Sequence, residues 1–462
     1  MQKIFILTGI MTLTGCTVFY SIPPSPTGMA DRLELSQQVI KRRKQEAQTL
    51  SLHEKAVILE SRLLERFLLH PYALVSKYRK SNEIRGQIGP TSHYLAALAF
   101  QYAVTKNHDV RNVARRVIDS LRALDRSNGV DGYIPSWVSL EDGKLVVRGN
   151  ETHSNAYSQL LFGFVNAHEH LDDPEIRQSI QQHVKSIAEY FLVNDLVLRD
   201  GEGRAVPHSN ISPSLLQFSG SRCLDALVLA ETTLNILSKQ DSPWIERGMY
   251  EQHRKMVKSG YLQKIQNLQF HVFNFKLPTH STDWINFIRL YTLTRVSDNR
   301  AYSRALSRLF RAQRGENNPL FAIIYLANSN LGEDEFLQSQ INEYLQSFPI
   351  TLDNAEIINS LDPTIQKKWI PDIVKLKQRA EAATPLPIYR RPLNPQEWKR
   401  NPYRLDGNFS RQGDAAFPGI DYLLVYWMGR FYDVVDAPKT LKADAAPESF
   451  GAAGPRPMGK DP

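Results

Sequence analysis

The chain has 462 residues, of which 42% are hydrophobic and 23% are charged, so it has the composition of a globular protein with one large domain or two. Its 56 Lys and Arg residues against 48 Asp and Glu residues give a net charge of +8, which favours an anionic partner. The densest basic run, residues 41–44, contains no aromatic residue and is typical of a solvated helix face, so we expect no nucleic-acid partner.

The first 15 residues are typical of a secretion signal. Lys3 precedes an apolar run that is too short to cross a bilayer, and the run ends in Leu-Thr-Gly-Cys. This ending resembles the bacterial lipoprotein box, which implies that residues 1–15 are removed and that Cys16 carries a lipid anchor in the membrane. Thr17 stands where an inner-membrane retention signal has Asp, and this favours the outer membrane, on its periplasmic side or at the cell surface.

The remaining chain divides into three parts. Residues 16–29 are expected to form a Pro-rich tether, residues 30–432 one folded domain, and residues 433–462, rich in Ala, Pro and Gly, a disordered tail. With Cys16 lipidated, Cys223 is the one thiol left, so no intramolecular disulfide is expected. The apolar helical pattern around Cys223 predicts a buried side chain.

Helical periodicity dominates the domain. Residues 31–70 predict two helices that end at His70-Pro71, because a residue before proline avoids the helical region. After that, a helix that is apolar on most sides alternates with a more charged one, the first of these capped by Asp109. Such repeated pairs bury their apolar faces only by stacking on neighbours. The expected pairs are residues 92–105 with 109–124, 155–170 with 174–192, 221–237 with 243–260, 283–294 with 299–313, and 319–327 with 334–348.

Few segments are typical of strands. Residues 133–147 predict a hairpin that turns at residues 141–144, because Asp-Gly favours a tight turn, and residues 261–280 are a candidate for another extended segment. Residues 384–418 are rich in Pro, Arg and Asn, and residues 419–432 predict a final apolar element. The pattern as a whole predicts an all-α domain with a small β-hairpin insertion.

Three segments carry a resemblance to a known family. Residues 94–137 are similar to the helix-pair repeat of the six-hairpin glycosidases, and residues 191–213 resemble the stretch that closes the next pair. Residues 390–432 resemble a C-terminal signature of the same proteins through Trp398, Asn401-Pro402-Tyr403 and Asp406-Gly407. The resemblance implies an (α/α)6 toroid of repeated helix hairpins, with a central cleft formed by loops at one end of the inner helices.

Two polar loops that end in His-Ser-Asn are the candidate site. In the first, Glu151, His153 and Asn155 lie at a helix N-terminus, which suits an anion or an oxygen-rich ligand. The alternative is that Thr152 or Asn155 only caps this helix. Relatives carry an acidic pair where this chain has Asn155 and Ala156, and this departure argues against carboxylate catalysis of the family type.

The second loop combines Arg204, His208 and Asn210, a cation, an imidazole and an amide. Such a set suits a uronate or another acidic sugar, because an arginine pairs with a carboxylate through two parallel hydrogen bonds. The alternative is a long loop that is hydrogen-bonded to its own backbone.

Two kinds of catalysis fit these residues. Hydrolysis needs two carboxyl groups across the scissile bond, for which we assign Glu151 first and Asp421 second, with Asp131, Asp283 and Asp406 as competitors. Elimination instead needs a neutralising arginine or amide beside a tyrosine or histidine base, for which Asn155, Tyr157, Arg204 and His208 are available.

Aromatic residues complete the candidate site, since Trp137, Trp284, Tyr403 and Trp427 are able to stack on sugar rings, although Trp427 lies in an apolar run typical of a core. Asp131 and Trp137 are assigned to substrate binding with His153, Asn155, Arg204 and Asn210. No zinc spacing, phosphate loop or dinucleotide motif is present, so no metal or cofactor is expected.

The sequence thus predicts a monomeric, lipid-anchored protein of the bacterial envelope with a cleft for a glycan. Two hypotheses remain open: an enzyme that cleaves the glycan by hydrolysis or elimination, and a glycan-binding or assembly lipoprotein that has lost the catalytic acids.

Overall fold

The computed structural model describes residues 26–77, 85–125, 127, 129–147, 152–200, 202–214, 216–217, 219–237, 242–268, 271–272, 275–276, 280–328, 334–372, 377–407 and 415–437. The expected signal, most of the tether with Cys16, and most of the expected tail lie outside these residues. Within them, no helix combines the length and the apolar character that a membrane span requires.

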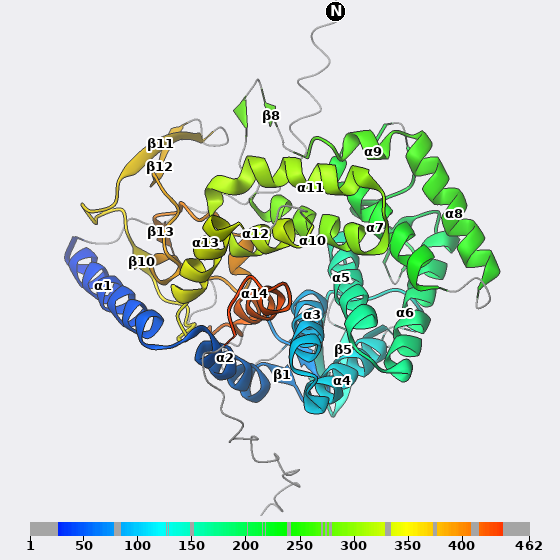
Figure 1. Ribbon diagram of the computed structural model, residues 1–462, viewed down its shortest axis with the longest axis horizontal. Coiled ribbons are helices and arrows are strands. Elements are labelled where there is room, and N and C mark those ends of the chain that lie inside the picture. Colours follow the sequence, from blue (N-terminus) through cyan, green and yellow to red (C-terminus); the bar gives the residue numbers. More distant parts are fainter. Residues whose placement is uncertain are drawn as a thin grey trace, which may run out of the picture.

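Six helices in the described part of the chain form a closed inner ring. Each contacts the next, and the last, α14, contacts the first, α3 (Figure 1). These helices are apolar on nearly every side, and in α3 all residues from Ile88 to Tyr102 are buried. The inner helices are α3 (Ile88–Thr105), α5 (Ser154–His170), α7 (Gly220–Ile236), α10 (His280–Val296), α12 (Pro319–Leu326) and α14 (Ile420–Phe431).

Six outer helices, counted over the same described residues, surround this ring (Figure 1). Each packs on the inner helix that precedes or follows it in its hairpin, and α6 and α11 also contact the next inner helix, α7 and α12. The double ring is an (α/α)6 toroid, which confirms the predicted fold class. The outer helices, each given with its inner neighbour, are α4 (His108–Asp125) on α3, α6 (Pro174–Val193) on α5, α8 (Pro243–Lys258) on α7, α11 (Arg300–Gln313) on α10, α13 (Glu335–Gln346) on α12, and α2 (Leu52–Arg66) on α14.

Local signals account for where the helices begin. Helix α6 starts at Pro174, and the carboxylate of Asp173 accepts hydrogen bonds from two backbone N–H groups of its first turn. The expectation that Asp109 caps α4 is wrong by two residues. Helix α4 already begins at His108, and the side-chain oxygen of Asn107 accepts from the backbone N–H of Asp109.

Small antiparallel sheets join the helices. The predicted hairpin is present as β4 (Trp137–Glu141) and β5 (Lys144–Val147), extended by β3 (Gly86–Gln87). The second His-Ser-Asn segment, expected as a loop, is the strand β7 (Ala205–Asn210) paired with β6 (Val197–Arg199). A hairpin that the sequence did not reveal consists of β11 (Lys367–Asp372) and β12 (Lys377–Ala382).

The other short elements lie at the periphery or before α14. The remaining strand pairs are β1 (Leu68–Leu69) with β2 (Leu74–Val75), β8 (His271–Val272) with β9 (Phe275–Lys276), and β10 (Ile357–Ile358) with β13 (Asp406–Gly407). The segment expected to be extended at residues 261–280 thus begins with a helical turn, α9 (Tyr261–Lys264), before β8 and β9. The 3-10 turns are η2 (Arg314–Glu316), η3 (Ile388–Arg390) and η4 (Glu397–Lys399).

Helix α1 (Pro26–Thr49) corrects two expectations. It begins at Pro26, inside the expected tether, rather than near Ala30. The basic run at residues 41–44 was expected to be solvated, and this is wrong for Arg43, which is 0% exposed because α1 packs against η3 and β10. Its guanidinium donates to the carbonyl oxygens of Asp353 and Arg391 at 2.8 and 3.3 Å, and burial lowers the pKa of Arg43 to about 10.

The apolar core fills the space between the two rings. Cys223 and Trp427, both expected there, are buried in it. Burial raises the pKa of the Cys223 thiol to about 11, so this side chain is an inert apolar group at neutral pH.

Candidate functional site

The N-terminal ends of four inner helices converge on one open cleft. The cavities of this cleft are lined by residues at the starts of α3, α5, α7 and α10, such as Gly89, Ser154, Ser221 and Thr282. At such ends the first backbone N–H groups have no partner within the helix and the helix dipole is positive. The toroid therefore directs the positive ends of four helix dipoles toward the cleft.

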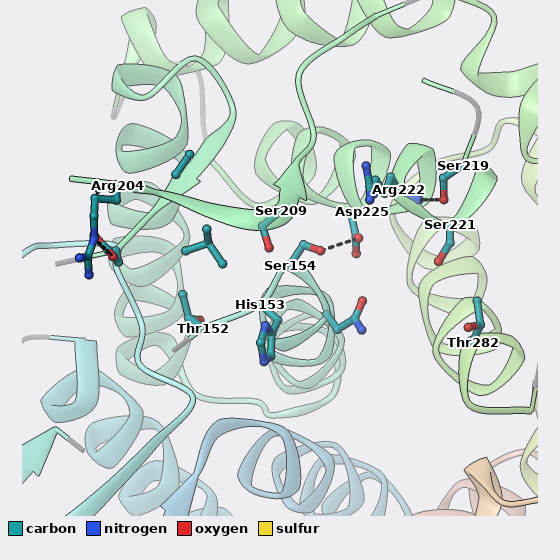
Figure 2. A pocket seen from close by; sticks show the side chains of 14 residues that line it. Thr152, His153, Ser154, Arg204, Ser209, Ser219, Ser221, Arg222, Asp225 and Thr282 are labelled. Carbon is teal, nitrogen blue, oxygen red and sulfur yellow. Dashed lines mark hydrogen bonds and ion pairs between the residues drawn. The ribbon is translucent and has the colours of Figure 1, made fainter. Parts of the chain in front are cut away.

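The cleft consists of two connected cavities. The larger one has a volume of about 940 Å³ and lies between α5, α7 and the strand β7 (Figure 2). The smaller one has a volume of about 370 Å³ and lies toward α3, β4 and η4. His153, Asn155, Ser221 and Thr282 line both cavities, so these residues form the boundary between them.

The start of α5 contributes polar side chains to both cavities. His153 is the N-cap residue, but its side chain makes no capping hydrogen bond, and neither Thr152 nor Asn155 caps the helix. The alternative of a purely capping role is therefore wrong. The Ser154 hydroxyl instead donates to a carboxylate oxygen of Asp225 at 2.8 Å (Figure 2), and the Asn155 side-chain oxygen accepts from the guanidinium of Arg289.

A buried ion pair supports the cleft from below. Arg289 on α10 is 0% exposed and forms a salt bridge with Asp225 on α7. The same guanidinium donates to the hydroxyl of Ser221 at 2.6 Å, and burial lowers the pKa of Arg289. In the sequence, each of these two residues is a charged side chain among the apolar residues of an inner helix, and this pattern indicates a buried charge that needs a partner. Arg289 thereby fixes two lining residues, Asn155 and Ser221.

The Arg204 side chain lies at the rim of the larger cavity and is already paired. Its guanidinium contacts the carboxylates of Asp200 at 2.9 Å and Glu202 at 2.7 Å, and it is 66% exposed. Desolvation raises the pKa of Asp200, but the hydrogen bonds from the Arg204 side chain and from the backbone N–H groups of Arg204 and Glu202 together outweigh it, so the pKa lies below its usual value. A ligand carboxylate at Arg204 would have to displace this ion pair.

The smaller cavity contains two lysines that the sequence did not single out. Lys77, two residues after β2, and Lys399, at the end of η4, both line it together with Trp137, Trp284 and Gln396. Burial lowers the pKa of both ammonium groups, and the charge of Lys77 helps to bring the pKa of Lys399 to about 8. No sequence pattern relates two lysines that are so far apart along the chain.

The structure brings some predicted site residues together and leaves others apart. His153, Asn155, Arg204 and Trp137 line the cleft, as does the candidate Trp284. The assigned binding residues Asp131 and Asn210 are exposed and are not among the lining residues of either cavity. Glu151 and the His208 side chain lie outside the described residues, so their assignment stays a prediction.

The competing carboxylates make contacts within the protein. Asp283 is 0% exposed and accepts from Gln313, while Asp406 accepts from the backbone N–H groups of Asn359 and Ser360, both at 2.8 Å. Tyr157 is buried, and its hydroxyl donates to the carbonyl oxygen of Gly132 at 3.1 Å. None of these three side chains lines the two cavities.

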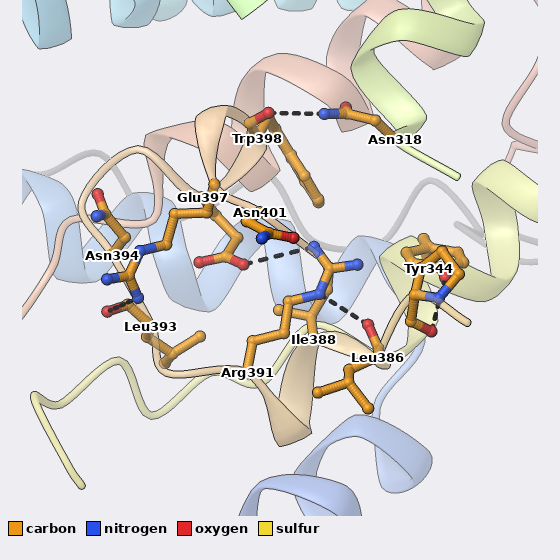
Figure 3. Close-up of polar contacts among 12 residues, drawn as sticks. Asn318, Tyr344, Leu386, Ile388, Arg391, Leu393, Asn394, Glu397, Trp398 and Asn401 are labelled. Carbon is orange, nitrogen blue, oxygen red and sulfur yellow. Dashed lines mark hydrogen bonds and ion pairs between the residues drawn. The ribbon is translucent and has the colours of Figure 1, made fainter. Parts of the chain in front are cut away.

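Asp421 is the first acidic residue of α14 and lies behind the smaller cavity. It is 5% exposed, and its carboxylate accepts a hydrogen bond from the backbone N–H of Glu397. The indole of Trp398 donates to the Asp421 carbonyl oxygen at 2.8 Å, and Glu397 is held by Arg391 at 3.5 Å (Figure 3). Burial raises the pKa of Asp421 to about 7. These contacts fix η4, which carries Lys399.

A metal site has no basis in the described residues, where no three His, Cys, Asp or Glu side chains are grouped as a metal ion requires. His168 and His170 lie in the last turn of α5, whereas His153 precedes its first turn, so these histidines are at opposite ends of the helix.

The double ring of six helix hairpins is the architecture that the resemblance to six-hairpin glycosidases implied. No family model matches the chain, and no curated protein matches it. Solved structures similar to it include a sugar epimerase from a ruminal bacterium, with a TM-score of 0.44 and 9% identity over 83% of this chain and 100% of that one. An unsaturated glucuronyl hydrolase specific for heparin has a TM-score of 0.43 and 8% sequence identity, over 86% of this chain and 98% of that one. Cellobiose 2-epimerase from Spirochaeta thermophila has a TM-score of 0.41 and 8% sequence identity, over 83% of this chain and 98% of that one. TM-scores this low do not indicate a shared function. The fold is assigned from the arrangement of the helices in this chain.

Proposed function

We propose that the protein binds a glycan in the cleft at the N-terminal ends of its inner helices. The observation that carries this proposal is the composition of the cleft, which combines hydroxyl and amide side chains with two tryptophans. Asn155, Gln159 and Ser221 supply hydrogen-bonding groups, and Trp137 and Trp284 lie in the walls of the smaller cavity. Hydroxyl-rich ligands need this combination of polar contacts and aromatic faces.

The carboxylates of the larger cavity favour binding over hydrolysis. Its described lining residues include two carboxylates, Asp200 and Asp225, and each already pairs with an arginine. A glycoside hydrolase needs one carboxylic acid and one carboxylate facing each other across the scissile bond. A glycan-binding or assembly role is therefore the function that the geometry supports best.

A glycan-cleaving enzyme is the second candidate, and one observation favours it. The pKa of Asp421 is raised to about 7, which is the range of a general acid at neutral pH. In this proposal Asp421 donates the proton, Glu151 is the second carboxyl group, and His208 assists as a base. Elimination by a base near Asn155 and Arg204 is the less favoured form of the same candidate.

The N-terminal sequence supports an envelope location. We propose that lipidated Cys16 anchors the protein to the outer membrane as a monomer, since the lipoprotein box ends at Cys16 and the first described helix begins at Pro26.

A glycan array with the purified domain tests the proposed glycan binding. The proposal fails if no glycan binds, or if binding is unchanged when His153 and Asn155 are both replaced by alanine.

A further inference from the structure

Two partly buried lysines, far apart in the sequence, face the smaller cavity. Lys77 and Lys399 both line it, and the Lys399 ammonium lies 5.9 Å from the centre of the Trp284 ring. Neither lysine forms an ion pair with any residue that the structure describes. Two partly buried ammonium groups that no ion pair neutralises are unfavourable beside each other, because partial burial penalises the charged form and like charges repel.

The contacts of the turn η4 fix the position of Lys399. Lys399 ends η4, which the hydrogen bonds of Glu397 and Trp398 attach to Asp421 at the start of α14. Trp398 itself is 1% exposed, and its carbonyl oxygen accepts from the side chain of Asn318 at 2.7 Å (Figure 3). A surface lysine on a mobile stem would lack this support.

Lys399 keeps most of its positive charge at neutral pH. Asp421 is the carboxyl group that acts on both ammonium groups, and with its own pKa at about 7 it compensates only part of their charge. The pKa of Lys399, at about 8, is still above neutrality. The smaller cavity therefore carries net positive charge.

Buried polar atoms in the same wall also lack partners. The indole N–H of Trp284 and the side-chain oxygen of Gln159 are buried and make no hydrogen bond to the described residues. Both residues line the cavity and are at least nine-tenths buried. Buried polar groups without partners are rare in folded proteins and indicate a site that is completed by a ligand or by water.

Arg204, which the sequence analysis assigned to an acidic sugar, is less suitable for this contact than the two lysines. Arg204 is exposed and already pairs with Asp200 and Glu202, so a ligand gains little there beyond an exchange of partners. The unpaired charge of the cleft lies on its other side.

We propose that Lys77 and Lys399 form an anion subsite of the cleft, which binds a carboxylate or sulfate group on the saccharide while Trp284 contacts the sugar ring. This inference rests on the proposed glycan-binding function and adds to it the chemical class of the ligand. An acidic polysaccharide is then the ligand, and Arg204 lies outside its principal ionic contact.

Calorimetric binding with matched pairs of probes tests the subsite. One pair is oligogalacturonate and its carboxyl-reduced, neutral counterpart, and the other is dextran sulfate and dextran. Each is titrated into the wild type, Lys77→Met, Lys399→Met and the control Lys258→Met, which removes an exposed lysine of the outer helix α8. Lys399→Arg keeps the charge, and near-ultraviolet circular dichroism verifies the fold of each variant.

We expect the wild type to bind at least one acidic probe about tenfold or more tightly than its neutral counterpart, the effect of a charge-assisted contact. Lys77→Met and Lys399→Met should lose this preference, whereas Lys258→Met and Lys399→Arg should keep it. If acidic and neutral probes bind equally, or if the preference survives in both methionine variants, the anion subsite is wrong while glycan binding stands. If no probe of either pair binds to the wild type, the anion subsite is wrong, and the glycan array decides separately whether glycan binding stands.

Discussion

Arg289 and Asp225 form an ion pair between the neighbouring inner helices α10 and α7, with side chains that are 0% and 4% exposed. The pair lies under the cleft, and the same guanidinium holds Asn155 and Ser221 in place. A charged pair at this depth contributes little net stability by itself, but each partner becomes costly when the other is removed. The cleft floor thus depends on both residues.

Removal of one partner should therefore destabilise the fold strongly. Asp225→Asn leaves the Arg289 charge buried without a counter-ion, and we expect a loss of about 3–5 kcal/mol in the free energy of unfolding. Urea unfolding followed by circular dichroism measures it. The matched control is Arg204→Met, which breaks an exposed ion pair and should change the free energy of unfolding little. Equal effects of the two variants would contradict the assigned role.

Asp421 should make stability depend on pH. Its pKa is raised from 3.8 to about 7 in the folded protein, so between these values the folded state holds a proton that the unfolded state releases. Stability should therefore fall as the pH rises through this window, at up to about 1.4 kcal/mol per pH unit. In this window the stability of Asp421→Asn should depend less on pH than that of the wild type. The exposed control Asp131→Asn should show the same pH dependence as the wild type. Parallel profiles in wild type and Asp421→Asn would disprove the shift.

Affinity for an acidic glycan should fall as the pH passes about 8, because Lys399 then loses its proton. Lys77, Asp421 and Arg400 are the charged groups that act on Lys399, so the titration is repeated in Asp421→Asn to separate the two ionisations. Lys399→Arg should retain affinity up to pH 9, since an arginine stays protonated. A wild type that binds equally at pH 7 and pH 9 would speak against Lys399 as the contact.

Catalysis by the assigned carboxyl groups is tested by product analysis. If the protein is a hydrolase, Glu151→Gln and Asp421→Asn should each reduce turnover of a cleaved glycan by at least about 100-fold, the usual contribution of a general acid or base. Full activity of both variants would refute the assignment. Absence of any product from a broad panel, together with binding that depends on His153, would establish the binding protein instead.

The proposed lipid anchor gives a prediction for the cell. Incorporation of labelled palmitate and recovery in the membrane fraction are expected for the wild type and not for Cys16→Ser, because the cysteine thiol is the acceptor of the lipid in a lipoprotein box. The unlipidated variant should keep the same thermal unfolding temperature, because Cys16 precedes the folded helices.

Periodicity predicted the helices of the toroid well, since inner and outer helices differ in the number of apolar faces that the sequence displays. Site residues near one helix start, such as His153 and Asn155, were also predictable. The pair Lys77 and Lys399 was not, because only the closure of the ring brings these segments together. The hairpin of β11 and β12 was missed since its strands are rich in lysine and contain Pro371, both unusual in strands.

The hairpin that closes the ring combines the two ends of the domain, with α14 inside and α2 outside. Five of the hairpins counted in the described residues are continuous in sequence, whereas this one joins an early helix to the last. During synthesis, the apolar faces of α2 and α3 must therefore wait for α14, and the growing chain cannot complete its core from the N-terminus onward. The closed ring of inner helices is therefore available only after the last helix of the domain has been made.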